Sequence, residues 1–466
     1  MNIELGRPEQ RLLKTLESAG ISPVYLVGGY VRNKLLFLPE GDRDIAAPFP
    51  PQALKEAESP EIQLKERAYG LGTVVVKQLF ENAAYTYEYT AFRCDNYGRG
   101  GEHIPQSVTF TQDIGKDALR RDFTVNALYA ERSGKVLDPT GRGFAALDGK
   151  KIGQVCPDTL KQDALRILRM VRFACELGFD IEEDTYACAK KYANQLKDIS
   201  RERIRDEFAK ILLSDTKYGK HDAVLKGLRM LKDIGALRFV FPQLLQGEGV
   251  AQSAVYHAYD VLEHGFYTCA ATSGDLTLRL AGLLHDIGKP EALLREGKMY
   301  GHDRIGETMA ERALKSLRFE KKTVRDVTEL IKYHMFDLRN EAHKKAVVRM
   351  ITRLGPEQFL RLCDLREADF AGSGKGNVAC SAQKWRTILK ELLGQDAPID
   401  RKKLAVNGND LKKELGIPEE KQIGTLLCRL HEYAIKKPSQ NNYKSLIRYA
   451  KIVNARDGAP DGKSGR

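Results

Sequence analysis

The chain has 466 residues, of which 42% are hydrophobic and 30% are charged, and its formal net charge is +12 at pH 7. A chain of this length and composition can bury several cores, so we expect three or four domains. The first ten residues are polar and no apolar run approaches the roughly 18 residues of a membrane span, so we expect a cytoplasmic protein. The eight cysteines form no Cys-x-x-Cys pair, which favours free thiols over a disulfide framework or a zinc ribbon.

The first informative segment is an apolar stretch that ends at two glycines. Val24 to Val27 is predicted to be a buried strand, and Tyr30 to Leu36 has helical periodicity. Gly28 and Gly29 allow the backbone to turn sharply and to approach a ligand without interference from a Cβ atom. The free N–H groups of the helix, together with Arg32, would then face an anion, and a triphosphate suits such a site.

Carboxylates follow this turn in two places. Asp42 and Asp44 are two residues apart, so on a strand both side chains would project from the same face. Adjacent carboxylates repel each other unless a cation lies between them, and hard oxygen ligands favour Mg²⁺. Glu88 lies in a run of alternating aromatic and polar residues that is typical of a strand, and it can supply a third carboxylate.

Two later segments combine cations with acids or amides. The first holds Arg121, Asp122 and Asn126 just before the chain becomes apolar. In the second, Asp163 and Arg166 have helical i, i+3 spacing, so we expect them to share one face of a helix. The ordered combination of glycine turn, acid pair and later motifs is considerably more specific than any fragment alone.

The motifs GGYVRNKLL, DRD, RRDFTVNA and DALRILRMVRFA resemble those of bacterial class II CCA-adding tRNA nucleotidyltransferases and the related poly(A) polymerases. They span residues 24 to about 175. The later string LAVNGNDL is similar to the tail of the CCA-adding branch rather than the poly(A) polymerase branch. The resemblance implies template-independent addition of CCA to tRNA 3′ ends, from CTP and ATP, by two-metal nucleotidyl transfer.

The resemblance also implies roles for individual residues. Asp42 and Asp44 would hold Mg²⁺ and, with Glu88, form the catalytic set. Asp163 and Arg166 are similar to the family's protein template, which reads the Watson–Crick edge of C or A and rejects U and G by leaving polar groups unpaired. The residues implied to bind the nucleotide are Gly28, Gly29, Arg32, Arg121, Asp122, Asn126, Asp163, Arg166 and Arg169.

Three positions depart from the family pattern. Asn33 stands where aspartate usually follows GGxVR, Gln162 where glutamate usually precedes the template aspartate, and Lys116 where an acid is common. The catalytic and template residues are intact, so we keep the catalytic interpretation. The segment from Arg93 to Gln112 has the full length of the loop that CCA-adding members use to switch from C to A, which disfavours a CC-only enzyme.

A second group of candidate residues lies downstream, around the string LLHDIGKP. Imidazole and carboxylate together are an ordinary ligand set for divalent transition metals. The sequence here resembles HD-superfamily metal phosphohydrolases, which implies a metal of the Mn, Ni, Co or Fe class. The implied ligands are His257, His285, Asp286 and Asp337, with His302 and His334 as additions for a second metal. We expect His264 to be a surface or capping side chain.

The predicted fold class is α+β: a nucleotidyltransferase head with a small sheet, followed by all-α neck, HD and tail domains. The boundaries that we expect are 1–148 for the head, 149–245 for the neck, 246–342 for the HD domain, 343–455 for a tRNA-binding tail and 456–466 for a disordered end. The last 66 residues hold 15 Lys and Arg against 7 Asp and Glu. This basic excess suits a polyphosphate partner such as tRNA.

Several alternatives remain open on the sequence alone. An enzyme that adds only A or only CC, or a poly(A) polymerase, is the nearest alternative function. A different class is an HD phosphohydrolase whose head serves as an RNA-binding scaffold. The lesser alternative for the HD module is a vestigial helical module that has lost its activity. The sequence is compatible with a monomer or a homodimer.

Overall fold

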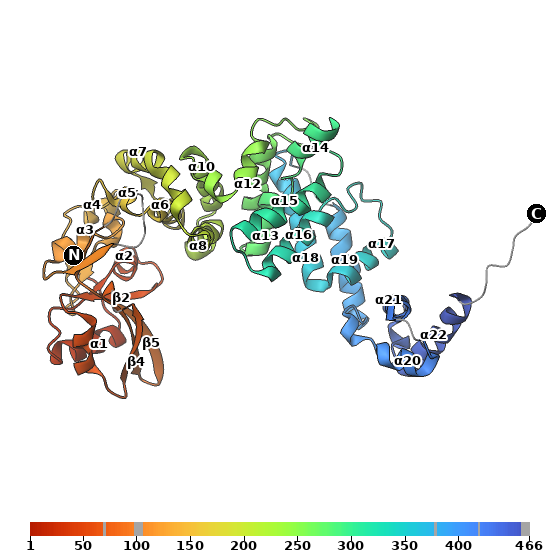
Figure 1. Ribbon diagram of the computed structural model, residues 1–466, viewed down its shortest axis with the longest axis horizontal. Coiled ribbons are helices and arrows are strands. Elements are labelled where there is room, and N and C mark those ends of the chain that lie inside the picture. Colours follow the sequence, from red (N-terminus) through yellow and green to blue (C-terminus); the bar gives the residue numbers. More distant parts are fainter. Residues whose placement is uncertain (69–70, 97–105, 377–379, 418–419, 458–466) are drawn as a thin grey trace, which may run out of the picture. The chain divides into compact units, whose positions relative to one another are not determined.

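The computed structural model describes residues 1–68, 71–96, 106–376, 380–417 and 420–457 (Figure 1). The chain divides into two compact units. Unit 1 comprises Met1–Gln246 with Arg312–Glu320, and unit 2 comprises Gly247–Glu311 with Lys321–Arg466. Unit 1 contains the sheet of the head, and unit 2 is helical. The α+β fold class expected from the sequence is confirmed, whereas the finer division into four folded domains stays a prediction.

The head is built on a seven-stranded sheet with the order β3-β4-β5-β2-β1-β8-β9. Its strands are β1 (Tyr25–Val27), β2 (Arg43–Ala47), β3 (Ile62–Ala68), β4 (Thr73–Phe80), β5 (Ala83–Ala91), β8 (Tyr129–Ala130) and β9 (Val136–Leu137). Strands β2 and β5 are parallel, and the other neighbours are antiparallel. The chain therefore completes the β3–β4 hairpin before β5 returns to the side of β2.

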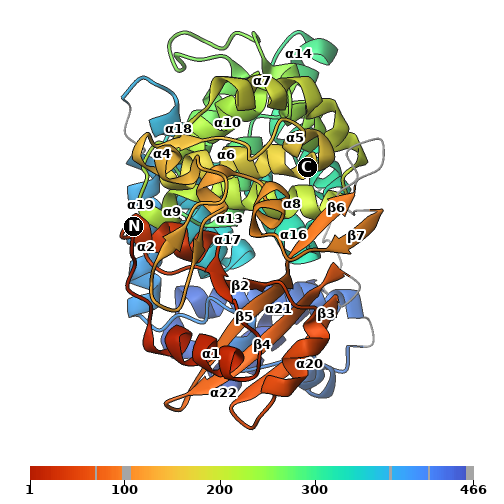
Figure 2. The same ribbon diagram turned by 90° about the vertical axis from the view of Figure 1, so that its left-hand side faces the viewer.

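The alternating sequence of β5 places successive side chains on opposite faces of the sheet. Tyr87 and Tyr89 are fully buried, while Glu88 between them projects to the opposite face of the sheet. Helix α1 (Arg7–Ser18) covers the sheet at β4, and its three inward leucines, Leu12, Leu13 and Leu16, are fully buried (Figure 2). One face of the sheet is thus committed to the core, which leaves the face of Glu88 available for a site.

Short elements complete the head. Helix α2 (Gly29–Leu35) follows β1, and a 3₁₀ turn, η3 (Thr124–Asn126), precedes β8. The others are η1 (Pro51–Ala57), α3 (Ile114–Leu119), α4 (Gly143–Asp148) and the strand pairs β6 (Arg93–Asn96) with β7 (Ser107–Phe110) and β10 (Lys151–Ile152) with β11 (Asp180–Ile181).

The remaining helices of unit 1 form the neck. They are α5 (Thr159–Gln162), α6 (Leu165–Leu177), α7 (Glu183–Tyr192), α8 (Arg201–Leu212), α9 (Ser214–Tyr218), α10 (Ala223–Asp233) and α11 (Leu237–Val240), with 3₁₀ segments η4 (Ala193–Asp198) and η5 (Pro242–Gly247). Helix α6 packs against α8, α9 and α10 and is apolar on most of its surface. It is therefore the central helix of the neck.

Two helices differ from the sequence-based expectation, in which the amphipathic stretches 160–177 and 181–196 each form one helix. A continuous helix from 160 to 177 is wrong, because Asp163 is extended (φ −139°, ψ 103°) and separates α5 from α6. The Asp163 side chain accepts from the backbone N–H of Leu165 at 3.0 Å, a local bond that competes with helix formation. The helix expected from 181 starts at Glu183, because Ile181 pairs in β11.

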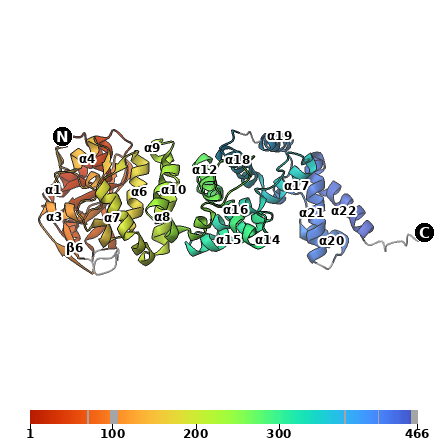
Figure 3. The ribbon, with the colours of Figure 1, turned by 90° about the horizontal axis from the view of Figure 1, so that it is seen from above.

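Unit 2 consists of α12 (Val261–Ala271), α13 (Leu276–Leu284), α14 (Lys289–Glu296), α15 (His302–Ser316), α16 (Lys321–Tyr333), α17 (Lys344–Leu354), α18 (Pro356–Gly372), α19 (Cys380–Gly394), α20 (Gly408–Leu415), α21 (Glu420–Lys436) and α22 (Tyr443–Asp457), with η6 (Arg401–Lys403) and η7 (Pro438–Gln440). Helix α15 crosses the boundary between the units. Helices α12, α13 and α16 pack around α18. The last three helices share a separate apolar core, and α21 lies beside α22 (Figure 3).

Two segments singled out in the sequence lie partly outside the described residues. They are the expected C-to-A switching loop, 93–112, of which 97–105 is outside, and the expected disordered end, of which 458–466 is outside. Residues 456 and 457 belong to α22, so the end of the folded chain was placed two residues too early. Within the described ranges, none of the helices combines the length and apolar content needed to cross a lipid bilayer.

Candidate active site and histidine centre

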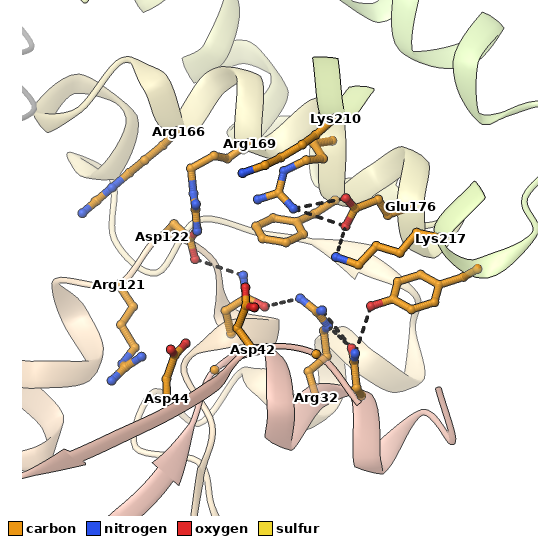
Figure 4. Close-up of a pocket in the computed structure, with 18 of the residues that line it drawn as sticks. Arg32, Asp42, Asp44, Arg121, Asp122, Arg166, Arg169, Glu176, Lys210 and Lys217 are labelled. Carbon is orange, nitrogen blue, oxygen red and sulfur yellow. Dashed lines mark hydrogen bonds and ion pairs between the residues drawn. The ribbon is translucent and has the colours of Figure 1, made fainter. Parts of the chain in front are cut away.

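The register of the sheet brings two carboxylates side by side. Asp44 and Glu88 are paired residues of the parallel strands β2 and β5, so their side chains project from the same face. Asp42 lies just before β2 and is exposed, whereas Asp44 is half-buried. Although only Asp44 is on the strand, Asp42 and Asp44 line the same cavity (Figure 4).

The electrostatics of Asp44 point to a cation. Burial raises the pKa of Asp44 to about 6, and the carboxylates of Glu88 and Asp42 act in the same direction, against the attraction of Arg121. A divalent ion between these oxygens would remove the repulsion. Because all three side chains offer carboxylate oxygens, the set fits Mg²⁺.

Gly28 makes the turn that carries α2 to the acids. Its φ of 69° with ψ −133° is a conformation that side chains with a Cβ rarely adopt. A Cβ at this position would also lie 3.5 Å from Oδ2 of Asp44 and 3.8 Å from Nη1 of Arg121. A glycine is needed here because the backbone conformation excludes other residues.

A chain of hydrogen bonds links α2 to α6 across the cavity. Nη1 of Arg32 donates to Oδ1 of Asn126 at 2.5 Å, and Nδ2 of Asn126 donates to Oδ1 of Asp122 at 3.1 Å. Oδ2 of Asp122 accepts from Nε and Nη2 of Arg169 at 2.9 and 2.6 Å. Burial opposes ionisation of Asp122, but Arg169 and Asn126 outweigh it and lower the pKa of Asp122 to about 2.

The two template candidates come from different elements. Arg166 lies in the first turn of α6, whereas Asp163 precedes that helix, so the expectation of one shared helical face is wrong. Arg166 donates from Nη2 to the carbonyl of Arg120 at 2.7 Å and from Nη1 to that of Thr159 at 3.3 Å. Both side chains nevertheless line the cavity. Oδ1 of Asp163 accepts from the N–H of Leu165, whereas Oδ2, which lies 3.6 Å from Nη2 of Arg203, keeps acceptor capacity.

These side chains enclose one cavity of about 710 Å³ in unit 1, which we call the polar cavity. Its charged lining comprises nine cations and five acids, namely Arg32, Arg120, Arg121, Arg166, Arg169, Arg172, Arg203, Lys210 and Lys217 with Asp42, Asp44, Asp122, Asp163 and Glu176. The excess of cations suits a ligand with several negative charges. The acids of the head and the arginines of α6 face this space from opposite sides (Figure 4).

Sequence reasoning missed the far wall of the polar cavity. Arg172 pairs with Glu207 at 2.7 Å and with Glu176 at 3.2 Å, and Lys217 approaches Glu176 at 3.3 Å. Arg172 follows Arg169 at helical spacing, and this periodicity could have identified it. Lys210 and Lys217 come from α8 and α9, and no local pattern distinguishes them from ordinary surface lysines.

A second cluster lies in unit 2, and we call its six residues the histidine centre. They form two groups, His264, His285 and Asp369 in one and Asp286, His302 and His334 in the other. In the first group Nε2 of His264 lies 3.1 Å from Nε2 of His285 and 3.0 Å from Oδ1 of Asp369. In the second, Nε2 of His302 lies 3.1 Å from Nε2 of His334 and 3.2 Å from Oδ1 of Asp286.

The outer nitrogens of the four rings show which atoms are available to a metal. Each Nδ1 faces a backbone carbonyl, at 3.2 Å for His264, 2.9 Å for His285, 2.7 Å for His302 and 2.6 Å for His334. A carbonyl can only accept, so Nδ1 carries the proton and Nε2 turns a lone pair inward. Lone pairs facing one another at 3.1 Å, beside carboxylates, fit divalent metal ions held by imidazole and carboxylate.

The histidine centre differs from the ligand set implied by the sequence. His264 is fully buried, so its expected surface or capping position is wrong. His257 lies beside the centre, with its ring 4.6 Å from that of His264, but belongs to neither group. Asp337 is also outside, because its carboxylate accepts from Nε1 of Trp385 at 3.0 Å and from the N–H of Ala342 at 2.7 Å. Asp369, in the last turn of α18, carried no recognisable sequence signal.

Models of known protein families match the chain in the regions that hold the polar cavity and the histidine centre. Residues 24–153 match a poly A polymerase head domain, residues 178–247 match a probable RNA and SrmB-binding site of polymerase A, and residues 254–369 match an HD domain. The chain belongs to the bacterial tRNA nucleotidyltransferase and poly(A) polymerase family. The HD match ends at Asp369, the carboxylate that the sequence analysis missed.

Individual members of the family resemble the chain over nearly its full length. An A-adding tRNA nucleotidyltransferase of Deinococcus radiodurans is 28% identical, over 87% of this chain and 90% of the relative. A CCA-adding enzyme of Streptococcus thermophilus is 29% identical, over 95% and 96%. In fold, the chain is similar to the Bacillus stearothermophilus CCA-adding enzyme in complex with CTP, with a TM-score of 0.68 and 23% identity over 97% of this chain and 99% of that one. Family members with different specificities are therefore almost equally similar in sequence.

Proposed function

We propose that this nucleotidyltransferase-family protein adds CCA to tRNA 3′ ends, with CTP and ATP as substrates and without a nucleic-acid template. The observation that carries the proposal is the polar cavity, where Asp42 and Asp44 lie on one side, with Glu88 paired to Asp44 on the neighbouring strand, and the cations of the neck lie on the other. A nucleoside triphosphate needs both a divalent ion at its phosphates and cations around them. The names of the relatives, which add A or CCA to tRNA, support the same substrate class.

The catalytic work falls to the head. Asp42, Asp44 and Glu88 would hold Mg²⁺, which when bound makes the RNA 3′-hydroxyl more acidic and neutralises the charge that develops on the phosphates. Arg32 and Arg121 flank this position and would fix the triphosphate. No covalent bond to the protein is required, because positioning and charge neutralisation supply most of the rate enhancement of phosphoryl transfer.

Base selection falls to the junction of α5 and α6. Asp163 can accept a hydrogen bond from the exocyclic amino group of C or A, and Arg166 uses only two of its five N–H donors on backbone carbonyls, which leaves others for ring acceptors. U and G present an oxygen where C and A present an amino group. Each wrong base would leave a buried polar group unpaired, at a cost of about 1 to 3 kcal/mol.

The decisive experiment supplies purified protein and Mg²⁺ with tRNA that lacks its last three nucleotides. CTP and ATP are offered separately and together, and the products are resolved at single-nucleotide length. We expect two additions with CTP alone and three with both. A parallel reaction uses tRNA that ends in CC. Addition of one A to this tRNA, with no extension of the shorter one, identifies an A-adding enzyme, arrest after two additions a CC-adding enzyme, and long A tracts a poly(A) polymerase. Equal incorporation of U and G would exclude the proposal.

We infer a second activity, metal-dependent hydrolysis of phosphoesters, at the histidine centre. The specific observation is that four imidazoles with fixed outer nitrogens and two carboxylates converge in two adjoining groups. Such a ligand set suits Mn, Ni, Co or Fe and would supply a metal-activated water. Hydrolysis of p-nitrophenyl phosphate by protein loaded with each metal tests this activity, with His285→Ala as the inactive variant. Hydrolysis that persists in His285→Ala would show that the activity arises elsewhere.

The scaffold alternative assigns all chemistry to the histidine centre and leaves the head to bind RNA. Pairing two variants separates it from the main proposal. We expect Asp42→Ala to abolish nucleotide addition and to leave phosphoester hydrolysis intact, while His285→Ala does the reverse. The scaffold alternative requires that Asp42→Ala leave every RNA-directed activity unchanged.

A further inference from the structure

The side chain of Asn33, on α2 at the wall of the polar cavity, uses all of its hydrogen-bonding capacity. Its Oδ1 accepts from Nε and Nη2 of Arg32 at 3.1 and 2.8 Å, and its Nδ2 donates to the carbonyl of Pro39 at 2.8 Å and to the hydroxyl of Tyr218 at 2.9 Å. The reversed amide would direct Nδ2 at the donors of Arg32 and Oδ1 at a carbonyl. The surroundings therefore specify one orientation.

Arg32 is a buried cation whose charge is not balanced by a bonded acid. It is 3% exposed, and burial lowers the pKa of its guanidinium. Among the described residues its hydrogen-bond acceptors are the amide oxygens of Asn33 and Asn126, and none of the carboxylates lies within ion-pair distance. A buried charge without an ionic partner is costly, so the cavity that Arg32 lines suits an anionic ligand at this point.

Asn33 also connects two helices of unit 1. Tyr218, which accepts from Nδ2 of Asn33, is the last residue of α9. Arg32 continues the connection through Asn126 to Asp122, the partner of α6. A carboxylate at position 33 would break the donation to Tyr218 and to Pro39 while forming an ion pair with Arg32.

We propose that Asn33 is a positioning residue that orients Arg32 toward the triphosphate without neutralising its charge. The inference rests on the proposed nucleotidyl transfer and explains why an amide, rather than the aspartate usual in the family, suits this chain. With aspartate at position 33, the carboxylate would compete with the phosphates for Arg32. Asparagine leaves the full positive charge of the guanidinium available to the nucleotide. The hydrogen bond from its Nδ2 to the hydroxyl of Tyr218 holds α9 at the wall of the cavity.

The test compares the affinities of CTP and CMP, which share base and sugar and differ in two phosphates. Equilibrium binding is measured by calorimetry in the presence of Mg²⁺ for the wild-type protein and for Asn33→Asp. We expect the affinity for CTP to fall about tenfold and that for CMP to change less than about twofold, because charge-assisted bonds to phosphate are affected selectively. The KM for CTP should rise in parallel with little change in kcat. Equal losses for CTP and CMP would indicate a merely structural role and overturn the inference.

Two further variants control for charge and for the contact with α9. Asn82→Asp adds the same negative charge at the exposed β4–β5 turn, outside the polar cavity, where the left-handed backbone (φ 64°) tolerates aspartate. It should leave both affinities unchanged. Tyr218→Phe removes the hydroxyl but keeps the amide acceptor for Arg32, so the ratio of CTP to CMP affinity should stay at the wild-type value. A loss as selective as that of Asn33→Asp would assign the effect to the helix contact instead.

The design separates failure of this inference from failure of the proposed function. A wild-type protein that neither binds CTP nor extends tRNA excludes the proposed function itself. A wild-type protein that does both, with an unchanged ratio of CTP to CMP affinity in Asn33→Asp, excludes only the positioning role. If Asn33→Asp does not fold, Asn33→Ser takes its place, since it removes the amide without adding charge. We then expect a severalfold loss of CTP affinity relative to CMP, and an unchanged ratio would again overturn the inference.

Discussion

The polar cavity and the histidine centre hold charge in different ways. In the cavity, arginines and acids are largely paired with each other, as Arg169 is with Asp122. The carboxylates proposed to hold Mg²⁺ come from two neighbouring interior strands of the sheet and from the residue just before one of them. In the histidine centre, ring nitrogens point at one another and their outer atoms are tied to backbone carbonyls. The cavity therefore suits a ligand that arrives with its own charge, whereas the centre suits a resident metal. This contrast teaches that the two sites will respond differently to the same kind of substitution.

The largest effect is expected on the rate of nucleotide addition, from a substitution in the polar cavity. Asp44→Asn should reduce nucleotide addition on the order of 10³-fold or more, because it removes a carboxylate that would hold the catalytic metal. Primer-extension rates with tRNA measure the loss, and phosphoester hydrolysis should stay at the wild-type rate. Asp148→Asn, at the exposed end of α4, is the matched control and should have no effect. A parallel loss of both activities would show that the two sites are not independent.

The next largest effect is expected on the metal content of the histidine centre and tests which residues bind the metal. Asp369→Asn or His264→Ala should lower the bound transition metal by up to one equivalent per chain, since each removes a ligand from one of the two groups. Metal content after dialysis, measured by mass spectrometry, checks this expectation. His257→Asn is the comparison, because His257 adjoins the centre without belonging to it, and it should retain its metal. Loss of metal from His257→Asn, with metal retained by the other two variants, would identify His257 as a ligand.

A smaller effect is expected from the pairing of Asp122 with Arg169. Because the pKa of Asp122 is lowered to about 2 from an ordinary 3.8, its ionised form stabilises the fold above about pH 4, and this contribution is lost as pH falls toward 2. Asp122→Asn should therefore lower the stability of unit 1 by about 2 kcal/mol at pH 7 and by roughly half as much at pH 3. Urea unfolding followed by circular dichroism at both pH values measures the difference. A pH-independent difference would assign the loss to packing instead.

The smallest effect is expected at Asp337. Asp337→Asn should leave the metal content unchanged and lower stability by about 1 kcal/mol, the usual contribution of a hydrogen bond, as the bonds to Trp385 and Ala342 weaken. Asparagine tolerates the left-handed backbone of this residue (φ 54°), so the backbone is not strained. Trp385 is the only tryptophan in the chain, and its fluorescence reports the contact directly. Loss of metal in this variant would contradict the assignment of Asp337 as a structural residue.

Local sequence patterns predicted those parts of the molecule that depend on local contacts. The apolar strand before Gly28, the alternation around Glu88 and the His285-Asp286 pair are short-range signals, and each lies where a site was expected. Asp163 was assigned to a helix because i, i+3 spacing cannot reveal a side chain that bonds to the backbone two residues ahead.

The remaining site residues depend on contacts between distant segments. Asp369 and His264 meet only because α18 packs on α12, and their separation in sequence leaves no period to detect. Lys217 and Tyr218 reach the polar cavity in the same way, from α9. Which of these distant residues come into contact is decided by the packing of the helices, and patterns within a single sequence do not reveal it.

The parallel pairing of β2 with β5 has a consequence for how the head can evolve. Asp44 and Glu88 are adjacent in space, yet 43 residues of chain, including the β3–β4 hairpin, lie between them. The β3–β4 hairpin forms the edge of the sheet on the far side of β5. Insertions or deletions at its turns would therefore leave the spacing of the two carboxylates unchanged. Length variation between the two acids is accordingly a poor guide to lost chemistry, and an intact pair can be recognised only by restoring the strand register.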